Sequence, residues 1–306
     1  MNRLVAIVGP TGIGKSKLAL KLAQIFGGEI VNADSRQVYC HMDIGTAKPG
    51  SQELSRIHHH LISIVNPDEN FSLAQYQALA GRAINDIHQR NKLPLLVGGS
   101  GLYVWSILEG WGIPEVPPDL EFRRSLEKVA ADVGGNEIYR ELVKVDPIAA
   151  RRIDRRNVRR VIRALEVCRG TGVPFSQLQN KDETPFDTLI IGLTTNRQEL
   201  YHRIDLRVDE MIKQGLTAEV EKLVNTGYGF DLSAMSGIGY KQIGMFLKGE
   251  LALPVAIQQI KYETHRFVRH QYAWFRLQDN RIKWFDVQSQ LDLKSAALLA
   301  EFVESK

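Results

Sequence analysis

The chain has 306 residues, of which 44% are hydrophobic and 24% charged, and its formal net charge at pH 7 is +4. This composition excludes a disordered chain, and the length predicts one to three domains with buried cores. Two cysteines, Cys40 and Cys168, exclude a disulfide framework and suit a reducing cytosol. Apolar runs stay short of the roughly 18 residues that a membrane span needs, and the first residues look like a strand rather than a signal peptide. We therefore expect a cytoplasmic protein without a membrane partner.

A glycine-rich segment at residues 9–16 reads Gly-Pro-Thr-Gly-Ile-Gly-Lys-Ser, between an apolar run at 4–8 and an amphipathic run at 17–26. The spacing G-x-x-x-x-G-K-[ST] between a strand and a helix is typical of a phosphate-binding loop. Glycines let backbone N–H groups point at an anion, and a helix N-terminus adds partial positive charge. Lys15 adds a full charge, and the Ser16 hydroxyl is the usual Mg²⁺ ligand in this pattern. A simple helix-capping turn is the alternative interpretation.

A second strand is expected at residues 29–33 and ends at Asp34. Ligands of parallel α/β sheets lie at the carboxyl ends of strands, which predicts that Asp34 lies near the phosphate. A helix N-cap is the alternative role for an acid at this position. The loop at 42–49 places Lys48 within reach of an anion. The histidines at 58–60 are interpreted as polar surface or as a phosphate contact, in preference to a metal site.

The next segments continue the alternation of helices and strands. A 3.6-residue period predicts a helix at 73–90, and Pro94 to Val97 reads as a buried strand. A second glycine turn at 98–101 opens a helix at 102–108. This order predicts an α/β fold, a P-loop NTPase-like parallel sheet with helices on both faces.

The pattern changes after a linker-like stretch at 112–118. From residue 119 to about 167 it is helical, which predicts an all-helical insertion at 113–186 within a catalytic core at 1–112 and 187–306. Residues 151–169 hold eight arginines and two acids. Because like charges on one helix face repel each other, this cluster suggests a phosphate or nucleic-acid contact, although a solvated face is the commoner reason for such a run.

The C-terminal part returns to mixed structure, with strands expected at 188–193 and 282–286. A helix at 197–214 places Arg203 and Arg207 on one face, where either could reach the phosphate or pair with a neighbouring acid. A turn at 236–241 is partly basic. A long helix at 254–277 interleaves basic and aromatic side chains, which favours either core packing or a surface that follows a nucleic-acid backbone. A last helix is expected at 291–304.

The chemistry of these parts favours an enzyme. A motor or switch ATPase needs an acid at the end of its central strand to help hold Mg²⁺, and the strand at 93–97 ends in glycines instead. Asp34 could hold Mg²⁺ or take a proton from an incoming nucleophile. The sequence therefore predicts that a di- or triphosphate is bound and that Asp34 acts on a second substrate, which the basic helices suggest is a polyanion.

Six segments in order carry a resemblance to a known family. These are residues 9–16, 32–39, 43–49 (Asp-Ile-Gly-Thr-Ala-Lys-Pro), 97–103, 160–166 and 237–242. Together they resemble the bacterial tRNA dimethylallyltransferases, over nearly the whole chain. Ser16 and Ser100 stand where that family commonly has threonine, which preserves the hydroxyl. Residues 269–274, Arg-His-Gln-Tyr-Ala-Trp, replace a more usual Lys-Arg-Gln-x-Thr-Trp.

The resemblance implies transfer of a dimethylallyl group from dimethylallyl diphosphate to N6 of adenosine 37 in tRNA, with Mg²⁺ as cofactor and tRNA as partner of a monomer. It implies Asp34 as the base, with Lys15, Thr11 and Arg207 at the diphosphate. The diphosphate site would comprise Gly9, Pro10, Thr11, Gly12, Ile13, Gly14, Lys15 and Ser16, the last also a metal ligand. The tRNA site would comprise Asp34, Ser35, Arg36, Gln37, Ser100, Arg123, Arg159, Arg160, Val161, Ile162, Arg163, Ser236, Gly237, Ile238, Gly239, Tyr240 and Lys241.

Three other functions compete with this one. An adenylate-type isopentenyltransferase would use free AMP or ADP as acceptor, but it needs neither the insertion nor the basic C-terminal helix. A nucleotide kinase would use the arginine-rich helix as a lid and would transfer phosphate from ATP. An RNA-binding ATPase switch would bind RNA in an ATP-dependent way and form no prenylated product.

Overall fold

The computed structural model describes residues 2–114, 116–178, 184, 186–287 and 290–305. One residue of the expected linker, position 115, lies outside these ranges. The chain divides into two compact units, one formed by residues 1–108 and 185–306 and the other by residues 109–184. Each unit is described by itself.

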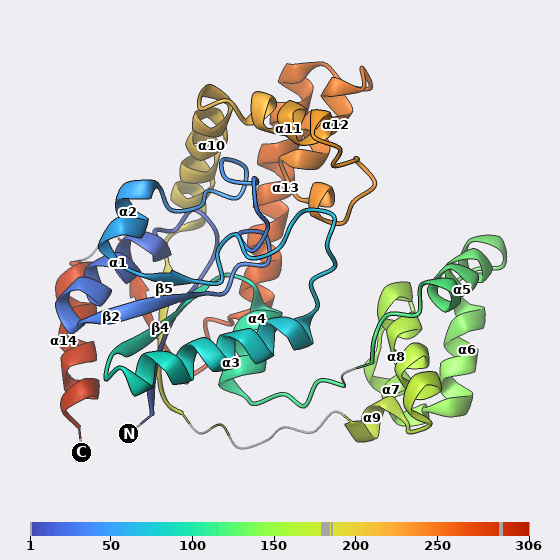
Figure 1. Ribbon diagram of the computed structural model, residues 1–306, viewed down its shortest axis with the longest axis horizontal. Helices are drawn as coiled ribbons and strands as arrows, with labels where there is room; N and C mark the ends of the chain where they lie inside the picture. The colour runs from blue at the N-terminus through green and yellow to red at the C-terminus, as the bar shows by residue number, and fades with distance from the viewer. Residues whose placement is uncertain (1, 115, 179–183, 185, 288–289, 306) are drawn as a thin grey trace. The chain divides into compact units, whose positions relative to one another are not determined.

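The larger unit is built on a sheet of six parallel strands in the order β3-β2-β4-β1-β5-β6 (Figure 1). The central strand β1 is apolar from Leu4 to Val8, and these five residues are completely buried. A parallel strand covered on both faces needs such a continuous apolar run. The strands are β1 (Arg3–Val8), β2 (Gly28–Asn32), β3 (His59–His60), β4 (Leu93–Gly98), β5 (Asp187–Thr194) and β6 (Ile282–Asp286).

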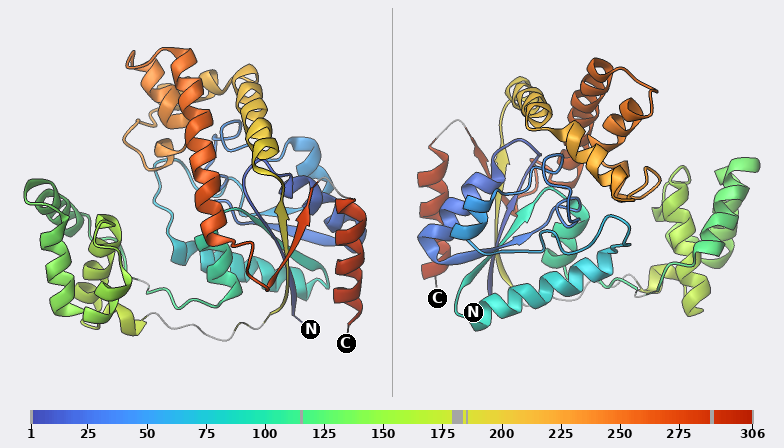
Figure 2. Two further views of the ribbon diagram at one scale, coloured as in Figure 1. Left: turned by 180° about the vertical axis from the view of Figure 1, so that it is seen from behind. Right: turned by 45° about the horizontal axis from the view of Figure 1, so that its top comes forward.

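Helices cover both faces of this sheet, which confirms the predicted fold class (Figures 1 and 2). The crossover from β1 to β2 runs one way along the sheet, and the crossover from β2 to β4 runs back. Because both are right-handed, their helices lie on opposite faces. One face carries α1 (Lys15–Phe26) and α14 (Leu291–Glu304), and the other carries α3 (Leu73–Gln89) and α4 (Gly101–Leu108).

A group of helices stands beyond the carboxyl ends of the strands in the same unit. The long helix α13 packs against both α10 and α12. The group comprises α10 (Arg197–Lys213), α11 (Leu216–Asn225), a 3₁₀ turn (Ala234–Ser236), α12 (Tyr240–Leu247) and α13 (Leu253–Trp274).

Two short elements of the larger unit were not predicted from the sequence. Helix α2 (Ser51–Arg56) and strand β3 are each too short to show a period.

The smaller unit consists of helices around its own apolar core. The core includes Ile138, Leu142 and Val161, all fully buried. Its helices are α5 (Leu120–Asp132), α6 (Gly135–Val145), α7 (Pro147–Arg152), α8 (Val158–Thr171) and α9 (Phe175–Leu178). Among the described residues of both units, no helix is long and apolar enough to cross a membrane.

Candidate active site

The glycine-rich loop connects β1 to α1 and bends in a way that only glycine tolerates. Gly9 has φ +138° and Gly14 has φ +104°, both in the left-handed region. A Cβ atom on Gly9 would lie 2.6 Å from the carbonyl oxygen of Leu193 in β5. The loop is therefore packed tightly against the neighbouring strand, and α1 begins at Lys15 directly after it. This is the geometry of a phosphate cradle at a helix N-terminus.

A buried amide joins this loop to the second glycine turn. The side-chain oxygen of Gln271, in α13, accepts the N–H of Thr11 at 2.8 Å. Its side-chain nitrogen donates to the carbonyl oxygen of Gly99 at 3.0 Å. Gln271 is 4% exposed; its hydrogen bond to Gly99 is buried, and the one from Thr11 is partly buried. No pattern in the sequence indicated this role for Gln271, which belongs to the segment 269–274 that departs in part from the usual family pattern.

Three charged side chains act on one another beside the loop. Burial lowers the pKa of Lys15 to about 8, the negative charge of Asp34 opposes this, and the positive charge of Arg207 adds to it. Burial also lowers the pKa of Arg207, and Asp34 again opposes the change. Two cations and one carboxylate therefore share a partly desolvated space with a net positive charge, which suits a bound anion. The amino group of Lys15 donates to the carbonyl oxygen of Pro10 at 2.8 Å.

Asp34 is held by its own loop and by the strand before it. Its carboxylate accepts the N–H of Arg36 at 2.8 Å, and its own N–H donates to the side chain of Asn32 at 3.1 Å. Asn32 is buried and also donates to the carbonyl oxygen of Leu61. The adjacent N–H of Ser35 donates to the hydroxyl of Ser100 at 3.0 Å, which ties the loop to the second glycine turn.

The segment 233–241 also reaches this loop. The guanidinium of Arg36 donates to the carbonyl oxygen of Ser233 at 3.0 Å, and Gly237 lies against the same side chain. Ser236 and Lys241 are exposed. Tyr240 is 1% exposed and donates its hydroxyl to Glu219, so its side chain is packed inside the unit, and its place in the tRNA site stays a prediction. Gly237 and Gly239 are buried as well, and Ile238 is half-buried.

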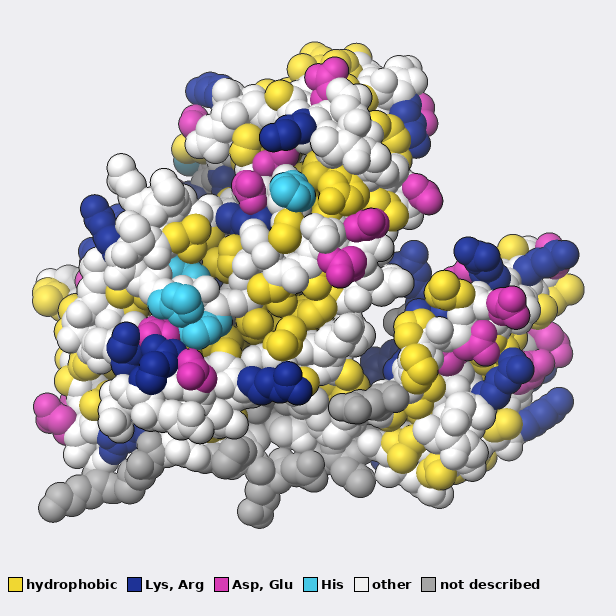
Figure 3. Space-filling view, in the orientation of Figure 1, with side chains coloured by type: hydrophobic (Ala, Val, Ile, Leu, Met, Phe, Trp, Pro, Cys, Tyr) yellow, Lys and Arg dark blue, Asp and Glu magenta, His cyan; other side chains and the backbone are white. Residues whose placement is uncertain are grey.

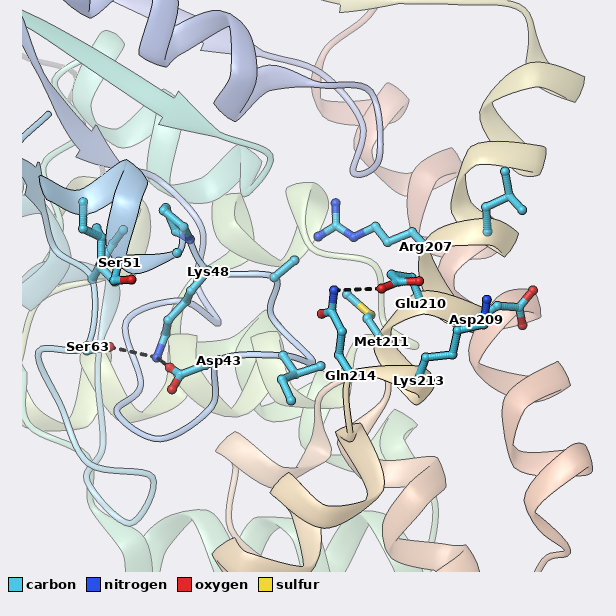
Figure 4. Close-up of a pocket in the computed structure, with 17 residues that line it drawn as sticks. Asp43, Lys48, Ser51, Ser63, Arg207, Asp209, Glu210, Met211, Lys213 and Gln214 are labelled. Carbon is cyan, nitrogen blue, oxygen red and sulfur yellow. Dashed lines mark hydrogen bonds and ion pairs between the residues drawn. The ribbon is translucent and has the colours of Figure 1, made fainter. Parts of the chain in front are cut away.

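A cavity of about 1160 Å³ opens between α10 and the loop at 43–49 (Figure 4). Arg207 points into it from α10, whereas Arg203 on the same helix pairs with Glu199 at 2.6 Å. This distinguishes the two arginines that the sequence analysis had left as alternatives. A small pocket lined by Ser16 and Gln37 shares Pro49 and Ile62 with the cavity.

Lys48 has its own protein partners, contrary to the expectation that it is available to an anion. Its amino group donates to Asp43 at 2.7 Å and to the hydroxyl of Ser63 at 2.8 Å, and it also bonds to the carbonyl oxygen of Tyr39. Its side chain is 5% exposed. Lys48 therefore stabilises the loop that walls the cavity.

The histidine run has separate roles. His59 lines the small pocket with Ser16, and burial lowers its pKa. His58, His60 and Glu29 bring potential metal-ligand atoms within 4.8 Å of one another. The carboxylate of Glu29 already binds both Arg90 and Lys92, so a metal ion there would have to displace a positive partner.

In the smaller unit, seven of the eight arginines of residues 151–169 are exposed, and Arg163 is half-buried. Among them, Arg159 and Arg160 lie on α8. Basic and acidic side chains are mixed on the face of this unit that Figure 3 shows. Val161 is completely buried and Ile162 is 3% exposed, so their side chains are directed away from solvent, and the predicted contact of residues 159–163 with tRNA stays a prediction. Both lie on the apolar face of the helix that packs into the core.

The same helix contains a buried acid that binds two of the arginines predicted to contact tRNA. Glu166 is 2% exposed and binds Arg123 at 2.7 Å and Arg163 at 2.5 Å. Although burial raises the pKa of Glu166, hydrogen bonds from both arginines bring it below the usual value. Arg163 and Arg123 are therefore ion-paired within the unit, and the run is not a bare cluster of like charge.

Comparison with known proteins places this chain in a family. The family described as IPP transferase matches residues 37–278. The tRNA dimethylallyltransferase of Dehalococcoides mccartyi is 51% identical over 98% of this chain and 92% of that protein. The tRNA dimethylallyltransferase of a Roseiflexus species is 47% identical over the full length of both chains.

Two solved structures share the fold. The tRNA isopentenylpyrophosphate transferase of Bacillus halodurans matches with a TM-score of 0.73 and 39% identity, covering 99% of this chain and 96% of that one. A eukaryotic dimethylallyltransferase acting on tRNA matches with a TM-score of 0.82 and 29% identity, covering 98% and 79%. The glycine-rich cradle, the strand-end acid and the sequence similarity over the whole length agree, and the chain belongs to the IPP transferase family, with the tRNA dimethylallyltransferases as its relatives.

Proposed function

We propose that this protein transfers a dimethylallyl group from dimethylallyl diphosphate to the exocyclic N6 of adenosine 37 in tRNA and releases diphosphate. The observation that carries the proposal is the grouping of Lys15, Asp34 and Arg207 beside a glycine-rich cradle. Two cations suit a diphosphate leaving group, and one carboxylate suits a proton acceptor.

The reaction breaks the bond between C1 of the prenyl group and its diphosphate oxygen, and it forms a bond between C1 and N6. Negative charge grows on the diphosphate as the first bond breaks, and Lys15, Arg207 and the backbone N–H groups of the cradle stabilise it. Thr11 lies in the cradle, where its N–H is bound by Gln271. Asp34 accepts the proton that N6 loses.

A magnesium ion fits this site by the chemistry of its donors. The side chain of Ser16 is exposed, and Asn32 and Gln37 line the small pocket beside it. Hydroxyl, amide and diphosphate oxygens are the ligands that Mg²⁺ prefers, and the bound ion would neutralise part of the diphosphate charge. Ser16 would hold it.

The acceptor adenine must leave the stack of the anticodon loop to reach a carboxylate at the end of a sheet. Ser35, Arg36, Gln37 and Ser100 surround Asp34 and would contact the extruded nucleotide. The exposed Ser236 and Lys241 would contact the nearby backbone. In the insertion, Arg159 and Arg160 would bind phosphates of the anticodon stem.

The test is a transfer assay with purified protein, Mg²⁺, labelled dimethylallyl diphosphate and unmodified tRNA that has adenosine at positions 36 and 37. We expect label on tRNA without ATP, and none on the same tRNA with guanosine at position 37. Label on AMP would favour the adenylate-type enzyme, and transfer of phosphate from ATP would favour a kinase. An ATP-dependent binding of RNA without prenylated product would identify a switch.

A further inference from the structure

A second carboxylate, away from the cradle, organises the loop that walls the cavity. Glu219 lies on α11, and its carboxylate accepts three successive backbone N–H groups from the loop. The distances are 2.9 Å from Asp43, 2.8 Å from Ile44 and 3.2 Å from Gly45. The hydroxyl of Tyr240, in α12, donates to the same carboxylate at 2.6 Å.

This arrangement requires an ionised carboxylate. Four donors converge on two oxygens, so any group that carried a hydrogen there would place one donor against another. Burial raises the pKa of Tyr240, and the negative charge of Glu219 raises it further, so the phenol keeps its proton and remains a donor. The fit is close, because a Cβ atom on Gly45 would lie 2.5 Å from the ring of Tyr240.

The clamped loop touches both halves of the site. Residues 43–44 and 47–50 form one wall of the large cavity, and Arg207 lies on the opposite wall (Figure 4). The carbonyl oxygens of Thr46 and Ala47 each accept the side-chain amide of Gln37 at 3.1 Å. Gln37 belongs to the loop that holds Asp34. A shift of the clamped loop would therefore change the shape of the cavity directly, and it would change the loop that holds Asp34 indirectly, through Gln37.

We infer that Glu219 is a positioning residue for the prenyl donor: its ionised carboxylate, together with Tyr240, fixes the loop at 43–49 so that the cavity keeps the shape that admits the dimethylallyl diphosphate facing Arg207. The inference rests on the proposed function. Glu219 touches no reacting atom and acts through the backbone of the loop.

The kinetic test compares Glu219→Gln with Glu221→Gln, which changes the same residue type at an exposed position of the same helix. The amide of the first variant directs N–H groups at the loop donors. We expect the KM for dimethylallyl diphosphate to rise about tenfold in Glu219→Gln, with an unchanged Kd for tRNA, and to stay at the wild-type value in Glu221→Gln. Tyr240→Phe should raise the same KM by a smaller factor.

Hydrogen exchange supplies a readout that does not depend on activity. The amides of residues 43–45 should be protected in the wild-type protein and should exchange at least about tenfold faster in Glu219→Gln, while amides in the central strand β1 stay protected. If Glu219→Gln does not fold, Tyr240→Phe carries both measurements.

The outcomes separate the two proposals. An unchanged donor KM together with unchanged exchange at 43–45 would overturn the role of Glu219. A lower active fraction of Glu219→Gln with an unaltered donor KM would also overturn this role, because it would show that Glu219 only stabilises the fold. A wild-type protein that transfers no label would refute the proposed function, while the exchange rates would still report whether Glu219 clamps the loop.

Discussion

The N–H of Thr11, in the first loop of the chain, donates to the side chain of Gln271, 260 residues later. The same amide group donates to Gly99, so one side chain spans both glycine turns. The glycine-rich loop is thus not self-contained. Its position depends on α13, which also packs against α10, the helix that carries Arg207.

Replacing Gln271 with leucine should weaken both stability and donor binding. The buried carbonyl of Gly99 would lose its partner, at a cost of about 1–3 kcal/mol in the free energy of unfolding, and the partly buried N–H of Thr11 would lose its partner at a smaller cost. Urea denaturation and the KM for dimethylallyl diphosphate measure the two effects. Gln258→Leu, at an exposed position of the same helix, serves as the control. Equal stability of the two variants would show that the bridge is unimportant.

Asp34→Asn should lower kcat by a factor on the order of 10²–10⁴ and leave the Kd for tRNA nearly unchanged, because an amide cannot accept the N6 proton. The asparagine oxygen can still accept the N–H of Arg36, so the turn is kept. Single-turnover transfer and a filter-binding assay measure the two quantities. Turnover at the wild-type rate would remove Asp34 from the chemistry.

The pH dependence of donor capture should follow Lys15, whose pKa is lowered to about 8. Below this pH the amine is charged in the free enzyme and attracts the diphosphate; above it, the charge is lost. Bound diphosphate raises the pKa again, because an opposite charge favours the protonated amine. We therefore expect kcat/KM for the donor to fall above about pH 8, whereas kcat stays level to higher pH. A flat kcat/KM up to pH 9.5 would contradict this assignment.

The lowered pKa of Lys15 also affects the free energy of unfolding. Its contribution becomes more favourable as the pH rises, whereas donor capture becomes weaker. The unfolded chain binds the proton of Lys15 more tightly than the folded protein does, since the ordinary pKa of 10.5 exceeds the folded value of about 8. This group therefore disfavours the folded state below pH 8, and its penalty disappears as the pH rises from 8 to 10.5. Lys15→Met should remove this part of the pH dependence of unfolding.

Removing the exposed charges of Arg159 and Arg160 together should weaken tRNA binding and reduce the slope of log K against log salt by roughly 1–2. A double alanine variant at Arg140 and Lys144 removes the same charge from another helix of the same unit and provides the control. Binding measured at several salt concentrations checks the slope. A slope equal to that of wild type would assign Arg159 and Arg160 to an ordinary solvated face.

Local patterns predicted the parts of the site that local geometry determines. The glycine spacing predicted the loop, and a strand ending at Asp34 predicted an acid at the same edge of the sheet. The strand at 282–286 and the helix at 291–304 begin and end as expected. Each of these features depends on residues that are close in sequence, and the fold class follows from their order.

Features that depend on distant partners could not be predicted. Gln271 and Glu219 are single polar residues in helices, and only packing shows that they face two loops. Tyr240 was interpreted as part of a partly basic turn, because the acceptor of its hydroxyl, Glu219, lies on another helix. Arg163 read as part of a bare basic cluster because a single acid, Glu166, serves two arginines. Periodicity predicts which side of a helix is buried, but it does not predict which polar group from another segment will contact that side.

The pairing of β1 with β5 also has a consequence for how the chain assembles. Val8 pairs with Gly192, about 180 residues later. On a chain synthesised from its N-terminus, strands β1 to β4 are complete at Gly98, and one edge of β1 stays open until β5 emerges. The insertion, with its own core, can fold during this interval. The phosphate cradle is thus the first part of the site to be made and among the last to be finished, since its neighbours Leu193 and Gln271 come much later; premature release of the chain would leave an apolar strand edge exposed to aggregation.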